Sequence, residues 1–244
     1  MEVTRDLIPV TTIADFHLED FLHSPKEFLQ KHVLKKGASA LTWQQLAQAT
    51  VNQVVRDYHK LPPDKRHAQT ILEMVQRYWV KKVEVFESHA HYYMVLAQIT
   101  DHLLQFLLPL RGHQEPVLLH ERLRVYSEEV QVELSMTFQV MEWSEQSFVI
   151  RKYIVKDDAQ VWDSYRFMTT LFCAKAFQQL PEKIEVYSML SGNVYQCQPS
   201  QDDIGKAVDY VHLAKHALQE TRYYAHKHVN TEKHEPSGIA AVYQ

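Results

Sequence analysis

The strongest constraint on the fold is a change of hydrophobic period between the two halves of the chain. The second half contains two long strand-like runs, a helix-like segment and two short strand-like runs, at residues 132–143, 147–155, 162–179, 184–190 and 194–197. Strands alternate their side chains with a period of two and helices with a period of 3.6. This order predicts a mixed central sheet with helices packed on it, which is an α/β fold.

The first half contains the sequence signals that start and end helices. Ser24–Glu27 and Thr42–Gln45 both have the pattern of a capping box, and Gly37 is placed to end the first of these helices. Two more helices are expected through residues 71–79 and after Ser88. Residues 1–112 are therefore predicted to be the helical part of the molecule.

The remaining boundaries follow from the same patterns. Residues 117–130 hold short alternating runs, and residues 201–228 return to a helical period. We expect one domain over residues 1–244, with the sheet core and its helices in residues 113–228. Residues 229–244 are polar and contain Pro236 and Gly238, so they are predicted to form a mobile tail.

Composition excludes several classes of protein. The net charge of −4 provides no global basic field for DNA or an anionic membrane. Two cysteines cannot form a disulfide framework or an iron–sulfur site alone, and the five glycines do not have the spacing of phosphate-binding loops. The start of the chain lacks the features of a signal peptide, and no stretch predicts a membrane span. We expect a cytoplasmic protein without a cofactor.

Two further groups of residues invite a metal hypothesis. His212 and His216 share a helix face, but no glutamate lies between them, so packed or solvated histidines are the better interpretation. Glu121 and Asp157 are acidic residues near the expected sheet. A solvated turn is the simpler interpretation for Asp157, and a displaced carboxylate cluster stays open.

A family resemblance is carried by segments in a fixed order. Ser24-Pro25 precedes Phe28 in the first capped helix, a helix around Asn52 follows, and strands at 134–140 and 149–155 come later. In this order the chain resembles the RecB/AddB-like branch of the PD-(D/E)XK nuclease superfamily over roughly residues 14–228. The resemblance implies a mixed sheet of that type with a long C-terminal helix.

The resemblance also implies where catalytic residues would stand. Asn52 occupies the place of the family's histidine and Gln139 that of its aspartate, while Arg151, Lys152 and Tyr153 stand where it has Asp-x-Lys. Such nucleases need carboxylates to hold Mg²⁺, which activates water and neutralises charge on the phosphate. Amide and cationic residues cannot replace them, so we expect degenerate motifs, no catalytic residue and no metal.

The expected function is therefore binding or scaffolding by a catalytically inactive bacterial protein. A protein partner is favoured, and DNA is a possible ligand through the basic residues Lys35, Lys36, Lys81 and Lys82. The alternatives are an active metal-dependent DNA nuclease with displaced carboxylates, and an unrelated α/β fold with the same order of elements. The sequence leaves the partner, the pathway and the oligomeric state open.

Overall fold

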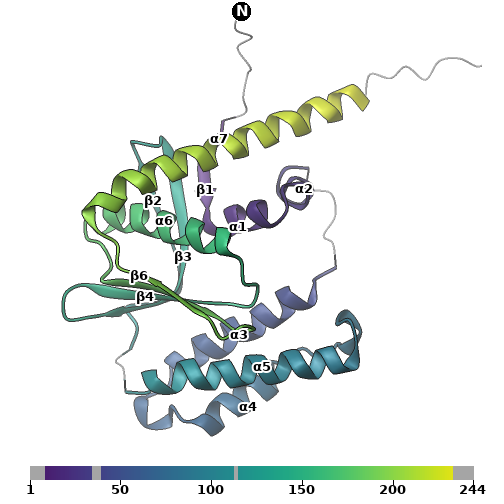
Figure 1. The fold of residues 1–244 in the computed structure, drawn as a ribbon, viewed down its shortest axis with the longest axis vertical. Coiled ribbons are helices and arrows are strands. Elements are labelled where there is room, and N and C mark those ends of the chain that lie inside the picture. Colours follow the sequence, from purple (N-terminus) through teal and green to yellow (C-terminus); the bar gives the residue numbers. More distant parts are fainter. Residues whose placement is uncertain (1–8, 35–39, 113–114, 233–244) are drawn as a thin grey trace, which may run out of the picture.

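The computed structural model describes residues 9–34, 40–112 and 115–232, with side chains as far as residue 221. Its centre is a six-stranded mixed sheet (Figure 1). The strands are β1 (Thr12–Ala14), β2 (Leu118–Ser127), β3 (Val132–Trp143), β4 (Phe148–Ile154), β5 (Lys183–Ser188) and β6 (Val194–Cys197). Pairing is parallel for β1–β3 and β4–β5, and antiparallel for β2–β3, β3–β4 and β5–β6.

Strand β3 holds three neighbours. β2 pairs with it from Val132 to Met141, so β2 occupies one edge of β3 almost completely. β1 pairs with residues 133–135 and β4 with residues 140–143, which places both on the opposite edge. Residues 136–139 of β3 therefore face a gap between β1 and β4. We call this gap the fork.

Helices cover both faces of the sheet (Figure 1). One face carries α1, α2 with a following π-helical turn, α6 and α7, and the other carries α3, α4 and α5. Their bounds are α1 Asp15–His23, α2 Pro25–Phe28, the turn Leu29–Val33, α3 Trp43–His59, α4 Ala68–Tyr78, α5 His89–Leu107, α6 Ala159–Ala176 and α7 Gln201–Glu232. Short 3₁₀ turns lie at Pro63–Lys65, Val83–Val85 and Leu108–Leu110.

Each face has its own hydrophobic core. Phe138, Ile150 and Phe172 belong to the core under α6 and α7. Val54 and Leu103 belong to the core between the sheet and α3–α5. The N-terminal helices are thus divided between the two faces, which brings α1 and α3 to opposite sides of the fork.

The capped helix starts are present. The Thr42 hydroxyl accepts a hydrogen bond from the Gln45 N–H and the Gln45 side chain accepts one from the Thr42 N–H, which completes the box at α3. Ser24 caps α2 through the Glu27 N–H. The expected helix end at Gly37 lies outside the described residues.

The mixed α/β fold with a long C-terminal helix is confirmed. Strand β3 has the expected bounds, and α6 begins and ends three residues earlier than expected. Two larger differences concern β1 and the end of α7. β1 lies in the half that was expected to be helical. It was not expected, because three residues are too few to show a strand period. Helix α7 continues to Glu232, so residues 229–232 are helical, and the rest of the expected tail lies outside the described residues.

The side-chain alternation of β3 changes phase at the fork. Phe138 packs into one core and Val140 into the other, although residues two apart in a regular strand share a face. On the neighbouring strand β2, His120 lies opposite Gln139 and adopts a left-handed backbone with φ 53°. This irregularity turns β3 where it leaves β4, and it places Gln139 between the two cores.

Candidate functional site

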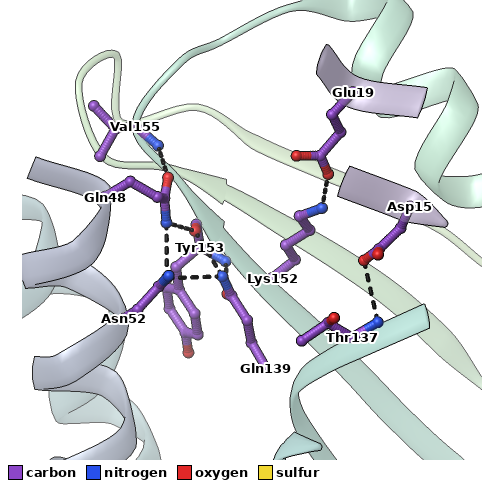
Figure 2. Close-up of polar contacts among 9 residues, drawn as sticks. All are labelled: Asp15, Glu19, Gln48, Asn52, Thr137, Gln139, Lys152, Tyr153 and Val155. Atoms are coloured by element: carbon purple, nitrogen blue, oxygen red, sulfur yellow. Dashed lines mark hydrogen bonds and ion pairs between the residues drawn. The ribbon is translucent and has the colours of Figure 1, made fainter. Parts of the chain in front are cut away.

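The fork is closed on one side by a side chain that replaces a strand. Asp15, the first residue of α1, lies directly after β1. Its Oδ2 accepts a hydrogen bond of 3.1 Å from the Thr137 N–H, which has no strand partner on that edge (Figure 2). The carboxylate thus continues the pairing that β1 ends.

A network of side-chain amides closes the other side of the fork (Figure 2). The Gln139 side chain accepts from the Tyr153 N–H at 2.5 Å and donates to the Tyr153 carbonyl at 3.2 Å. Gln48 of α3 also donates to that carbonyl, at 2.8 Å, and accepts from the Val155 N–H at 2.8 Å. Asn52 Oδ1 accepts from Gln139 at 3.0 Å and from Gln48 at 2.8 Å.

These contacts use most of the hydrogen-bonding capacity of the three amides. Gln139 and Gln48 each present one donor and one acceptor to the β4 backbone, as a neighbouring strand would. Gln139 is only 7% exposed, so its bonds are shielded from water. The network links α3, β3 and β4, and it leaves the Gln139 oxygen committed to the Tyr153 N–H.

Lys152 lies at the fork on the α1 side. Its ammonium forms an ion pair with Glu19 of α1 (Figure 2). The ammonium also lies 4.3 Å from the centre of the Tyr165 ring. Burial lowers the pKa of Lys152, and the nearby Asp15 carboxylate opposes that shift. Asp15 is 5% exposed, and its Oδ1 is buried without a hydrogen bond within the described part of the chain.

Arg151 points away from the fork. Neighbouring residues of a strand face opposite sides, and Arg151 lies on the face of α3–α5, where it pairs with Glu142 and, at 3.0 Å, with Glu185. Burial acts to lower the pKa of Arg151, but Glu142 and Glu185 hold it above its ordinary value. Gln139, Arg151 and Lys152 therefore do not face one pocket, although they lie on the adjacent strands β3 and β4.

The remaining candidates lie elsewhere. Lys81 and Lys82 are exposed in the segment after α4, and Lys35 and Lys36 lie outside the described residues. Glu121 is exposed on β2. Asp157 accepts hydrogen bonds of 2.7 Å from both Ser191 and Tyr195, which lowers its pKa against the opposing effect of burial. Asp157 therefore stabilises the turn between β5 and β6.

Asp15, Glu19 and Gln48 were not identified from the sequence. Asp15 follows a strand too short to recognise, and Glu19 belongs to a helix without a motif of its own. Gln48 lies four residues before Asn52, a spacing that places both side chains on one helix face and could have revealed it. Among the described residues, no group of three or more His, Cys, Asp or Glu side chains could hold a metal ion.

Comparison with known proteins supports the fold. No protein-family model matches the chain, and no curated protein is significantly similar to it in sequence. A crystal structure of a protein from Eubacterium rectale, described as a candidate exonuclease, matches with a TM-score of 0.51 at 7% identity. The match covers 95% of this chain and 91% of that one. The chain thus shares the fold of that structure over nearly its whole length. In the described residues, no helix is both long and apolar enough to cross a membrane.

Proposed function

We propose that this chain is a catalytically inactive, degenerate relative of the RecB-like nucleases, and that it acts by binding another macromolecule. The observation that carries the proposal is the amide network at the fork. Gln139 and Asn52, at the positions implied for an aspartate and a histidine, are hydrogen-bonded to each other, and Gln139 is also bonded to the β4 backbone.

The chemistry of the fork supports the loss of catalysis. Mg²⁺ prefers several hard, charged oxygen ligands, and an amide oxygen that already accepts an N–H is a poor substitute. The nearest carboxylates, Asp15 and Glu19, face the Lys152 ammonium, and Glu19 is paired with it. A lysine held in that place repels a second cation. Phosphodiester hydrolysis by metal-activated water therefore lacks its metal-binding centre.

A protein is the favoured partner. The net charge of −4 gives DNA no general attraction. Lys81 and Lys82 offer a local basic contact, and such a contact alone would bind DNA modestly and with strong salt dependence.

Two assays test the proposal. The purified chain is incubated with linear double-stranded and single-stranded DNA and either Mg²⁺ or Mn²⁺, and no cleavage is expected. Retention of the same DNA is measured at low and moderate salt, beside a Lys81→Glu/Lys82→Glu variant. No retention at low salt leaves protein as the partner. Retention that the double variant weakens, with a shallower salt dependence, makes DNA the ligand.

The alternative of an active nuclease has one observation in its favour. Asp15 has an unbonded buried oxygen and lies with Glu19 at the fork, so both are better placed than Glu121 or Asp157 to be displaced catalytic carboxylates. Cleavage that is lost in Asp15→Asn and kept in the matched surface variant Glu121→Gln would overturn the proposed inactivity.

A further inference from the structure

The outer surface of α5 lacks the charge that an exposed helix surface usually carries. The buried residues of α5 form one stripe, which packs into the core between the sheet and α3–α5. On the opposite side of the helix, Met94 is 52% exposed and Tyr93 is 61% exposed. Asp101 is the single Asp, Glu, Lys or Arg among the 19 residues of α5. Large apolar side chains therefore face solvent on this helix with little charge around them.

Helix α7 shows the composition that is usual for an exposed surface. One large apolar residue, Leu213, is exposed there, at 70%. Most of the other exposed positions of α7 carry charged or polar side chains, namely Gln201, Asp202, Lys206, Asp209, His216 and Glu220. Because a surface helix normally turns such residues away from the core, the exposed stripe of α5 is the exception in this molecule.

The exposed stripe has the spacing of a contact between two helices. Its centre consists of Ala90, Met94, Ala97 and Asp101, all exposed and separated by steps of four, three and four residues. Steps of three and four residues define the seam of a coiled coil, in which each side chain of the seam fits between residues of the facing helix. The two alanines leave room for the methionine of a second helix, since the distance between helix axes depends on the side chains at the contact.

The position of Asp101 decides the direction of a second helix. If two copies of α5 paired in parallel, their Asp101 carboxylates would lie against each other and repel. Antiparallel pairing about the midpoint between Met94 and Ala97 instead places Asp101 beside Ala90 of the second copy. Ala90 lies in the first turn of α5, where helix N–H groups carry partial positive charge, and the exposed His89 is next to it. The stripe is thus complementary in charge to a second copy of itself in the antiparallel direction.

We propose that the exposed stripe of α5 docks a second copy of this chain, as an antiparallel helix pair about a twofold axis. Each copy contributes the same surface, as in the isologous interface of a twofold dimer. Met94 of each copy packs on Ala97 of the other, and each Asp101 faces the N-terminal turn of the other α5. The stripe faces away from the core and contains no residue of the fork, so the inference does not depend on the proposed function.

The experiment measures the oligomeric state of the full chain in reducing buffer. Sedimentation equilibrium is followed from about 2 to about 300 µM protein, because a contact between two helices is small and small interfaces bind weakly. The expected result is a reversible equilibrium between monomer and dimer. A chain that stays monomeric over the whole range would overturn the inference.

Three variants assign the contact to α5 and test its direction. Met94→Glu places a charge at the centre of the stripe and is expected to weaken the dimer about tenfold or more. Leu213→Glu makes the matched change on α7 and is expected to alter the affinity less than about twofold. Asp101→Lys sets a cation against the helix N-terminus of the second copy and is expected to weaken the dimer about fivefold.

The same three variants can contradict the proposal. A parallel pair would only exchange one contact between like charges for another in Asp101→Lys, so an unchanged affinity of this variant would overturn the antiparallel arrangement. Equal weakening by Met94→Glu and Leu213→Glu would overturn the assignment to α5. All three substituted residues are exposed, and circular dichroism checks that each variant is folded as the wild type is.

Discussion

At the scale of single residues, two glutamine side chains make the hydrogen bonds that a neighbouring strand backbone would otherwise make. Gln139 and Gln48 bond the N–H and C=O groups that β4 exposes after it leaves β3. A buried backbone group without a hydrogen-bond partner costs about 1–3 kcal/mol. These amides are therefore needed to bond the backbone where β3 and β4 separate. Gln139, which stands where the resemblance implies an aspartate, therefore also holds the fork together.

Gln139→Ala is therefore expected to lower the free energy of unfolding by about 2–3 kcal/mol, because it leaves the Tyr153 N–H unbonded and opens a small cavity. Denaturant unfolding followed by circular dichroism measures the change. Gln146→Ala, an exposed residue of the β3–β4 turn, is the control and should stay within about 0.5 kcal/mol. A loss in both variants, or in neither, would contradict the role given to Gln139.

The lowered pKa of His120 predicts that the protein loses stability in acid. Burial, with Arg56 and Lys60 nearby, lowers this pKa from 6.5 to about 4. The unfolded chain thus binds the proton more readily, so the stability contribution is complete above pH 6.5 and is lost as the pH falls toward 4. His120→Asn removes the titration, and asparagine tolerates the left-handed backbone at φ 53°.

Comparing denaturation midpoints at pH 7.5 and pH 5 tests this contribution. The wild-type protein should lose more stability between the two pH values than His120→Asn does. Other histidines, including His23 with its lowered pKa, are unchanged between the two proteins and cancel in the difference. An identical loss in both proteins would show that His120 is not the responsible group.

At the scale of elements, two glycines predict opposite effects of the same substitution. Gly192, in the turn between β5 and β6, has φ 73°, and an added Cβ would lie 2.6 Å from His102 Nε2. His102 is itself held by a 2.9 Å hydrogen bond with the Met189 carbonyl. Gly205 lies inside α7, where an added Cβ would meet nothing within 4 Å.

Gly192→Ala should therefore destabilise the protein by about 2 kcal/mol, since it combines a left-handed alanine with a steric clash. Gly205→Ala should stabilise it by about 0.5–1 kcal/mol, because alanine is the better helix former. Thermal unfolding of the two variants beside the wild type gives both signs. A stabilising Gly192→Ala would mean that the turn has another conformation.

At the scale of the whole molecule, the sheet separates two cores, and the fork is the place where both meet. If the fork holds no metal, divalent ions have no specific site through which to favour the folded state. The melting temperature should therefore be the same, within about 1 °C, in EDTA, 10 mM Mg²⁺ and 1 mM Mn²⁺, conditions chosen to exceed typical binding constants. A rise of several degrees that Asp15→Asn abolishes would instead reveal a metal site with Asp15 as ligand.

The sequence by itself determined the elements whose signal is local. The period of residues 132–143 identified β3 with its bounds, and Thr42–Gln45 identified the start of α3. Periodicity and capping depend on neighbours a few residues apart, so they can be read from the chain alone. The identification of Asn52, Gln139 and residues 151–153 as former catalytic positions came from resemblance, and it stays a prediction.

The tertiary structure alone decided what these residues contact. Asp15 meets Thr137 across 122 positions, and Gln48 meets Tyr153 across 105. The phase change of β3 at Gln139 and the left-handed His120 arise where two cores compete for one strand, and no local pattern encodes that competition. Arg151 and Lys152 differ by one position, yet strand geometry sends them to opposite faces and to different carboxylates. Pairing between distant segments depends on how the whole sheet assembles, which is why the sequence located the strands but not the partners of their side chains.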